Sequence, residues 1–342
     1  MAGSKVVTFG EIMLRLTAPN YQRLVQVNSF DAAYAGGEAN VAVSLAQFGM
    51  NSYYVTKVPD NPLGYGALGH LQRYGVKTDY VIKGGKRLGI YFVEAGASQR
   101  PSMVIYDRAS SAIAEAKPGE FDWKKIFDGA EWFHFTGITP ALSDTAAALT
   151  LEALKVAKEY NITVSCDLNY RKKLWTPEKA NAVMSGLMPY VDICIGNEED
   201  AANTFGIELA ETDVVQGKLN VESYLNVAEE LKKRFGFKYV ATSLRESYSA
   251  SDNGWSVLLY DGEKMYHSKK YNIHIVDRVG GGDSCAAALI YALMDGRDLQ
   301  DCVEFAAAAS CLKHTIPQDF NLVTIEEVER LKRGDASGRV QR

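Results

Sequence analysis

The sequence contains no long hydrophobic run. None of its apolar stretches approaches the roughly 18 residues that a membrane-spanning helix needs. Its first residues lead directly into a strand-like stretch at 6–9, without the apolar segment of a secretory leader. We therefore expect a cytoplasmic protein with no membrane partner.

Basic residues are not in excess. The 37 lysines and arginines are outnumbered by 42 acidic residues, and the formal net charge is −5. Because a protein that binds nucleic acid usually carries a basic surface, we expect no nucleic-acid partner. Any functional cation should act locally.

Cysteine is scarce and shows no C-x-x-C pairing. The five cysteines lie in apolar stretches typical of strands or helices: Cys166, Cys194, Cys285, Cys302 and Cys311. We interpret them as reduced core thiols rather than as disulfides or metal ligands. The chain also has no fixed-period repeat and no low-complexity tract, which argues against a solenoid.

Strand-like and helix-like segments instead alternate along most of the chain. This alternation predicts an α/β fold with a mostly parallel sheet, covered by helices on both faces, whose ligands bind at the C-terminal ends of the strands. Strand patterns occur at 6–16, 52–58, 132–135, 162–168, 191–195, 238–243 and 255–260. Helical spacing occurs at 41–48, 63–74, 144–160, 221–235, 283–294 and 299–312.

The alternation stops between residues 84 and 108. Two short β-rich segments, 89–94 and 102–106, follow each other without a helix, and we interpret them as an antiparallel flap. Asp252-Asn253-Gly254 and Asp261-Gly262 are typical of turns and predict successive hairpins. A polar stretch at 211–220 has little pattern, and we expect 334–342 to be a flexible tail.

Three consecutive glycines, Gly280 to Gly282, lie between a strand-like run and a helix-like one. Backbone amides at such a helix start can converge on an anion, and the helix dipole favours its negative charge. Asp283 in the first turn would then be a proton acceptor beside a bound phosphate. An ordinary glycine turn followed by a common first-turn Asp is the alternative.

The run from Asp277 to Asp283 resembles the D-x-x-G-[AG]-G-D signature of the ribokinase-like (PfkB) carbohydrate kinases. In that family the last Asp is the catalytic base and the glycine amides form an anion hole. The resemblance implies these roles for Asp283 and for Gly280, Gly281 and Gly282. The run is neither a Walker loop nor a G-x-G-x-x-G dinucleotide motif.

The stretch Gly36-Gly37-Glu38-Ala39-Asn40 is similar to the sugar-binding G-G-x-x-N motif of the same family. A turn followed by a helix capped by Asn40 is the structural alternative. The family's longer pattern has glycine where this chain has Pro59. The resemblance implies a ribokinase-like α/β domain over 1–333, with lid segments at about 12–35 and 84–110.

The resemblance also implies ATP and Mg²⁺ as cofactors. Asn197-Glu198-Glu199-Asp200 stands where the family has N-x-x-E, and its final acid is one methylene shorter. We therefore expect Asp200 to act on the metal through water, or alternatively to complement a helix dipole. The implied ATP-binding residues are Asn169, Arg171, Asn197, Thr242, Arg245, Gly280 and Gly282. Leu244 and Ser247 replace glycines of the family's T-x-G-x-x-G nucleotide loop.

Four segments, 105–108, 167–171, 242–247 and 313–321, resemble the 2-keto-3-deoxygluconate kinase branch of the family. The implied substrate contacts are Gly36, Gly37, Asn40, Tyr91, Tyr106, Arg108, Arg171, Asp283 and Asp319. Two arginines near a polyol pocket favour an anionic substrate, although surface arginines are common. For Asp319 an ordinary loop turn is the alternative.

These patterns predict an ATP-dependent kinase that converts 2-keto-3-deoxygluconate to its 6-phosphate. A fructokinase-like enzyme, a ketodeoxygalactonate kinase and a non-catalytic sugar-acid sensor are the alternatives. Because a flap with one apolar face often needs a partner, we expect a homo-oligomer that forms through this lid.

Overall fold

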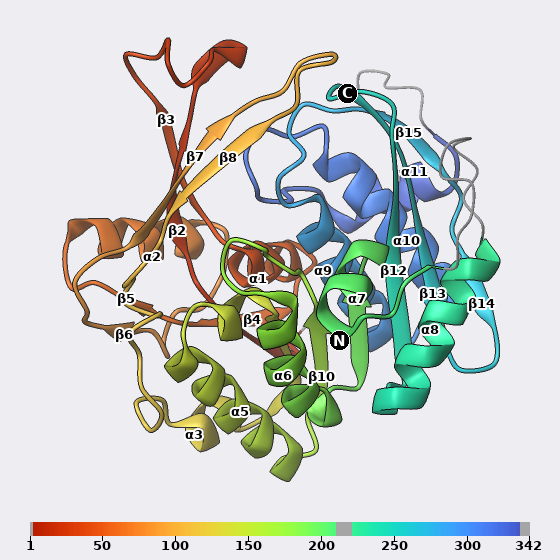
Figure 1. Cartoon of the computed structure of the whole chain (residues 1–342), viewed down its shortest axis with the longest axis horizontal. Helices are drawn as coiled ribbons and strands as arrows, with labels where there is room; N and C mark the ends of the chain where they lie inside the picture. Colours follow the sequence, from red (N-terminus) through yellow and green to blue (C-terminus); the bar gives the residue numbers. More distant parts are fainter. Residues whose placement is uncertain (1–2, 210–220, 336–342) are drawn as a thin grey trace.

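The computed structural model describes residues 3–209 and 221–335. Its centre is a nine-stranded sheet in the order β14-β13-β12-β11-β10-β9-β1-β4, with β15 also paired to β13 (Figure 1). The strands from β12 to β4 run parallel, as predicted. They are β1 (Lys5–Phe9), β4 (Asn51–Val55), β9 (Ala130–Thr136), β10 (Thr163–Asp167), β11 (Ile193–Gly196) and β12 (Tyr239–Ser247).

One edge of this sheet is antiparallel. Here β13 (Asp252–Tyr260) pairs with β12, and β14 (Met265–His267) and β15 (Tyr271–His274) pair with β13. The prediction of a turn at Asp252-Asn253-Gly254 is wrong, because all three residues lie within β13. Ser249 makes the turn instead, and its hydroxyl accepts hydrogen bonds from the amides of Ser251 and Asp252.

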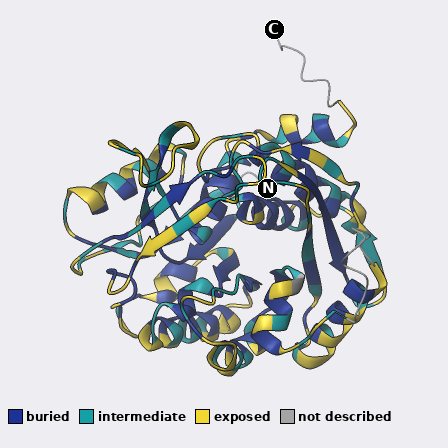
Figure 2. Ribbon diagram, turned by 45° about the horizontal axis from the view of Figure 1, so that its top comes forward, coloured by how far each residue is buried: buried dark blue, intermediate teal, exposed yellow. Residues whose placement is uncertain are grey.

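Helices cover both faces of the sheet, as expected for buried parallel strands. One face packs against α3 (Trp123–Phe127), α5 (Asp144–Glu159), α6 (Pro177–Leu187), α7 (Glu198–Phe205) and α8 (Val221–Phe235). The other packs against α1 (Gly37–Gln47), α9 (Gly281–Met294), α10 (Leu299–Lys313) and α11 (Ile325–Lys332). Figure 2 shows the central strands as the buried layer between them.

The remaining helices and small strands are short or lie outside the two main helical layers. They are α2 (Pro62–Arg73), α4 (Ile138–Ala141), the 3-10 turns Pro19–Tyr21 and Met188–Tyr190, and the paired strands β5 (Lys57–Val58) and β6 (Ile82–Lys83). Two short amphipathic helices, α6 and α11, were not predicted from the sequence. Across the described residues, no helix has both the length and the apolar character needed to cross a membrane.

A second sheet, which we call the lid, projects from the body (Figure 1). Its strand order is β3 (Asp31–Ala35), β2 (Met13–Thr17), β7 (Gly89–Glu94) and β8 (Met103–Asp107). The predicted lid segments therefore pair with each other. The sheet is mixed rather than wholly antiparallel, because β2 and β7 run parallel.

The strand predicted over 6–16 is two strands in different sheets. The chain leaves the central sheet after β1 and enters the lid as β2. At the break, a Cβ at Gly10 would lie 2.1 Å from a carboxylate oxygen of the buried Glu38. Of the weakly patterned segments, 211–220 and 336–342 lie outside the described residues.

Candidate active site

The glycine run forms the N-terminus of α9, as predicted. Gly280 precedes the helix with φ of 84°, in the left-handed region that favours glycine. A Cβ there would lie 2.1 Å from the carbonyl oxygen of Asp319, and one at Gly281 would lie 2.4 Å from the His314 ring. The segment around 314–319 therefore packs directly on the glycine turn.

Two amides of this turn have no acceptor inside the helix. The main-chain N–H groups of Gly282 and Asp283 lie in the first turn of α9, where no carbonyl precedes them at helical spacing. Gly282 borders open space, since a Cβ there would meet no atom within 4 Å. An anion can therefore approach these donors.

A polar cavity of about 530 Å³ adjoins the glycine turn at the C-terminal ends of β10, β11 and β12. Six of the seven residues predicted to bind ATP line it: Asn169, Arg171, Asn197, Arg245, Gly280 and Gly282. Asp283 lines it as well. The predicted ATP-binding residues, which are spread over more than 100 positions of the sequence, thus line a single cavity.

Thr242, the seventh residue predicted to bind ATP, does not line the polar cavity. Side chains alternate along β12, and Ser243, Arg245 and Ser247 line the polar cavity. Thr242 lines a small apolar hollow beside Tyr224 of α8 instead. Its position gives no support to the predicted ATP contact, and Ser243 is the hydroxyl on the cavity side.

Asp283 is buried, with 9% of its surface exposed. Its Oδ2 accepts a hydrogen bond of 2.7 Å from the side-chain amide of Asn40. Burial raises the pKa of Asp283 to about 7; the Asn40 hydrogen bond opposes this shift and the charge of Asp319 adds to it. The carboxyl group therefore changes its protonation near neutral pH, which suits a general base.

Asn40 joins the G-G-x-x-N turn to this carboxylate. Gly36, not Asn40, is the N-cap residue of α1, and its amide donates a 3.3 Å hydrogen bond to Oδ1 of Asn40. A Cβ at Gly36 would lie 1.9 Å from the carbonyl oxygen of Glu11, so only glycine fits. Gly37 lies beside Asp283, since its Cβ position is 3.7 Å from Oδ1.

A buried ionic network lies between the lid and the glycine turn. Arg15 of β2 donates hydrogen bonds of 2.5 Å to Asp277 and to Asp319. Tyr91 of β7 donates its hydroxyl hydrogen to Asp319, with oxygen distances of 2.9 and 3.0 Å. The predicted substrate residues Tyr91 and Asp319 thus lie together, and Arg15, which the sequence analysis missed, holds them to the lid.

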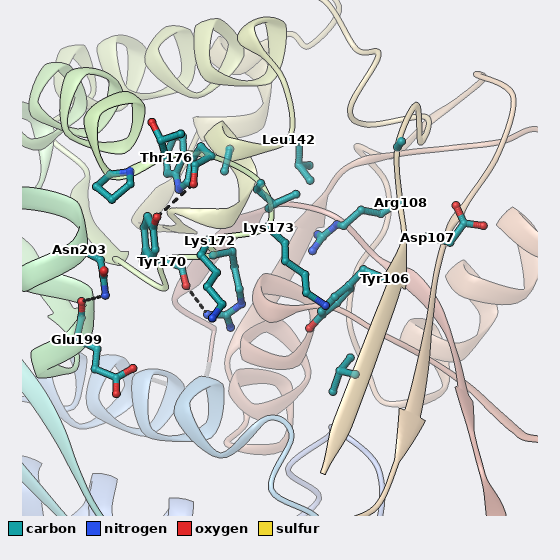
Figure 3. A pocket seen from close by; sticks show the side chains of 17 residues that line it. Tyr106, Asp107, Arg108, Leu142, Tyr170, Lys172, Lys173, Thr176, Glu199 and Asn203 are labelled. Atoms are coloured by element: carbon teal, nitrogen blue, oxygen red, sulfur yellow. Dashed lines mark hydrogen bonds between the residues drawn. The ribbon is translucent and has the colours of Figure 1, made fainter. Parts of the chain in front are cut away.

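A larger cavity of about 1180 Å³ separates the lid strand β8 from the loop at 170–177 (Figure 3). Tyr106, Arg108 and Arg171 line it, together with Lys172 and Lys173. Arg171 also lines the polar cavity, as do Tyr170 and Glu199, so these residues border both spaces. The cationic lining favours an anionic ligand.

Arg108 already has an acidic partner. Its Nε donates a 2.7 Å hydrogen bond to Glu11, which also accepts from Ser111. The guanidinium lies 5.3 Å from the centre of the Tyr106 ring. The charge of Arg108 is therefore shared with Glu11, whereas Arg171 donates to the carbonyl oxygen of Tyr170.

Each carboxylate oxygen of Asp200 accepts a hydrogen bond from a main-chain amide. Its Oδ1 accepts from the amide of Tyr170, and its Oδ2 accepts from the amide of Asn197 within a capping box. Asp200 therefore fastens the start of α7 to the loop that follows β10. No cluster of three or more His, Cys, Asp or Glu side chains suited to a metal occurs among the described residues.

A match over most of the chain identifies its protein family. The sequence profile of the pfkB family carbohydrate kinases matches residues 4–317. The chain belongs to the PfkB family of carbohydrate kinases.

The similarity to known relatives covers nearly the whole length of this kinase. The crystal structure of a 2-dehydro-3-deoxygluconokinase from Thermotoga maritima is 56% identical, with a TM-score of 0.93 over 97% of this chain and 98% of that one. A 2-dehydro-3-deoxygalactonokinase from Haloferax volcanii is 33% identical over 98% of each chain. A 2-dehydro-3-deoxygluconokinase from Bacillus subtilis is 28% identical over 92% of this chain and 91% of its own.

Several residues of the kinase site escaped the sequence analysis. Besides Arg15 they include Glu11, Asp167, Ser243, Lys172 and Lys173. Asp167 was visible at the end of β10, and burial followed by the charges of Asp200 and Asp283 raises its pKa well above the usual range. Arg15 and Glu11 carry no local signal, because their partners are distant in sequence.

Proposed function

We propose that this kinase transfers the terminal phosphoryl group of ATP to the 6-hydroxyl of 2-keto-3-deoxygluconate, also called 2-dehydro-3-deoxygluconate. One observation carries the proposal. Asp283 and the open amides of its helix lie between the polar cavity and the ionic network beneath the lid, and Arg171 borders both cavities. The 56% identity to a 2-dehydro-3-deoxygluconokinase supports the substrate.

Asp283 is the proposed catalytic base. The 6-hydroxyl oxygen attacks the γ-phosphorus of ATP, its proton passes to the Asp283 carboxylate, and the bond to the bridging β–γ oxygen breaks to release ADP. The open amides of Gly282 and Asp283 point at the transferring group and stabilise its negative charge. The left-handed Gly280 aims them at that point.

The polar cavity is the proposed ATP site. Asn169, Arg171, Asn197, Ser243 and Arg245 supply donors for phosphate or base. A magnesium ion bound with the nucleotide would neutralise part of the charge of its phosphates. Asp200 and Asn197 would contact that ion through water, since both Asp200 oxygens accept main-chain hydrogen bonds.

The sugar acid is proposed to bind beneath the lid. Gly36, Gly37 and Asn40 face the reacting hydroxyl, and Tyr91, Tyr106 and Asp319 offer hydrogen bonds to the others. A carboxylate that leaves water needs a charge-assisted partner, and Arg108 and Arg171 supply it. Lys172 and Lys173 add positive charge to the same wall.

A 2-keto-3-deoxygalactonate kinase is the second candidate, because the 33% identical relative from Haloferax volcanii bears that name. The two sugar acids differ at one stereocentre, and both present a carboxylate. Initial rates with each epimer at equal concentration distinguish them, and a higher kcat/KM for the gluconate epimer supports the first proposal.

We also propose one kinase domain over 1–333 that works in the cytoplasm, where ATP is available, and that forms a homo-oligomer through the lid. Met103 and Ile105 of the edge strand β8 are 43% and 45% exposed. Exposed apolar residues on an edge strand favour pairing with a second copy. A monomeric mass by light scattering at assay concentration would contradict the oligomer.

A further inference from the structure

Lys313, the last residue of α10, is completely buried. Its ammonium group donates hydrogen bonds to three main-chain carbonyl oxygens: those of Gln318 at 2.6 Å, Asp277 at 3.2 Å and Ile316 at 3.4 Å. In the part of the chain that the structure describes, its Nζ has no carboxylate within ion-pair distance. The buried charge is therefore solvated by backbone.

Burying a charge is costly unless it serves several strong hydrogen bonds, and an apolar residue of equal volume would avoid that cost. Burial lowers the pKa of Lys313, while the nearby Asp277 and Asp319 oppose this shift. A lysine kept at such a position suggests a task that needs its charge.

The three carbonyls belong to the two segments that meet at the glycine turn. Asp277 begins the run that ends in the anion-binding amides, and its Oδ2 accepts from the amide of Gln318. Gln318 precedes Asp319, whose carbonyl oxygen contacts Gly280 so closely that no Cβ fits. The ammonium group thus lies at the point where both segments are joined.

From this geometry we infer that Lys313 is a positioning residue for phosphoryl transfer. It holds segments 277–282 and 316–319 together so that the amides of Gly282 and Asp283 point at the transferring phosphoryl group. The inference rests on the proposed kinase reaction. Lys313 touches no substrate and acts through the main-chain carbonyls that it holds.

The first test is Lys313→Met, which keeps most of the volume and removes the charge. A misplacement of catalytic groups by about 1 Å can cost roughly 100-fold in rate, so we expect kcat to fall by about that factor. The KM values for ATP and sugar acid should change by less than about threefold. Lys232→Met is the matched control.

Lys232 also donates to three main-chain carbonyls, those of Phe237, Lys238 and Asp261. These lie at the opposite end of β12 from the polar cavity, so its substitution should leave kcat unchanged. Equal losses of kcat in the two variants would indicate a general structural effect and would contradict the inference.

Chemical rescue is the second test. Lys313→Ala opens a cavity beside the same carbonyls, and ammonium chloride should restore part of the lost kcat. Tetramethylammonium chloride at equal ionic strength should not, because that ion is too large and has no N–H donor. Lys313→Met should respond to neither salt, because its side chain fills the space.

Amide hydrogen exchange of segment 277–282 gives a readout other than activity. Faster exchange there in folded Lys313→Met, with unchanged exchange in the central strands, supports the inference. A Met variant with wild-type kcat, or one that fails to fold, contradicts it, because the first makes the charge dispensable and the second makes it a requirement of the whole fold. If the wild type transfers no phosphoryl group, the proposed function fails, and the exchange experiment still tests the positioning.

Discussion

The side-chain amide of Asn40 donates a 2.7 Å hydrogen bond to Asp283, which lies 243 positions later in the chain. This contact joins the first turn of α1 to the first turn of α9. It also joins the two motifs that define the predicted sugar site and the predicted base. The protonation of Asp283 therefore depends on a residue of the sugar site.

Asp283→Asn should preserve the fold and remove the base. General-base catalysis contributes about 10²- to 10⁴-fold, so kcat should fall by at least that order while calorimetric affinities for both substrates stay similar. Asp144→Asn is a control, because Asp144 is an exposed residue at the start of α5. Near-normal turnover without the Asp283 carboxylate would assign the proton to another acceptor.

Activity should rise with pH through the neutral range. Burial raises the pKa of Asp283 to about 7, and only the deprotonated carboxylate accepts a proton, so kcat/KM should rise with its midpoint near that pH and level off above it. Asn40→Ala removes the hydrogen bond that lowers this pKa, and the midpoint of the profile should move to higher pH. A midpoint near the ordinary value of Asp, about 4, would refute the assignment.

Loss of either arginine should weaken the selection of a sugar acid. Removal of a hydrogen bond to a charged group costs roughly 1.5–3 kcal/mol, so Arg108→Ala and Arg171→Ala should each lower kcat/KM for the keto-acid about 10- to 150-fold. Arg171 borders both cavities and should affect ATP as well, whereas Arg108 borders only the larger one.

Fructose serves as the neutral reference substrate for this experiment. If the wild type phosphorylates fructose as well as the keto-acid, and Arg108→Ala leaves the ratio of the two rates unchanged, the carboxylate does not contact Arg108. The fructokinase-like alternative would then be the better account.

Arg15→Met should destabilise the fold. It would leave the buried carboxylate of Asp319 and that of Asp277 without their cation, and breaking a buried ion pair in this way costs about 3–5 kcal/mol. Urea unfolding measures this difference. Arg87→Met, which breaks the exposed pair with Asp107, should cost less than about 1 kcal/mol. Equal effects of the two substitutions would mean that the Arg15 network contributes little.

Local patterns were sufficient to predict the alternating strands and helices and the glycine turn. Glycines at 280–282 and the apolar spacing of α9 are signals within about 15 residues, so the helix and its anion-binding start follow from sequence. The pair β7 and β8 was predictable for the same reason, because two short strands without a helix between them interrupt the alternation, whereas β2 was hidden in a single strand predicted over 6–16.

Contacts between distant residues were not predictable. Arg15 meets its partners 262 and 304 positions away, and Lys313 meets carbonyl oxygens whose direction no side-chain pattern encodes. Nothing in the sequence indicated that both oxygens of Asp200 accept hydrogen bonds from main-chain amides. The sequence likewise named Thr242 where the alternation of β12 presents Ser243 to the cavity.

The most direct test is turnover of ATP by the purified protein with a panel of sugars: 2-keto-3-deoxygluconate, its galactonate epimer, fructose and ribose. Release of ADP gives the rate, and phosphorus NMR locates the phosphate on the product. We predict that 2-keto-3-deoxygluconate has the highest kcat/KM and is phosphorylated at the 6-hydroxyl, and that Asp283→Asn abolishes the signal. The proposal would be contradicted if a neutral sugar is phosphorylated rapidly while neither keto-acid is phosphorylated. It would also be contradicted if no phosphoryl group is transferred to any of the four sugars.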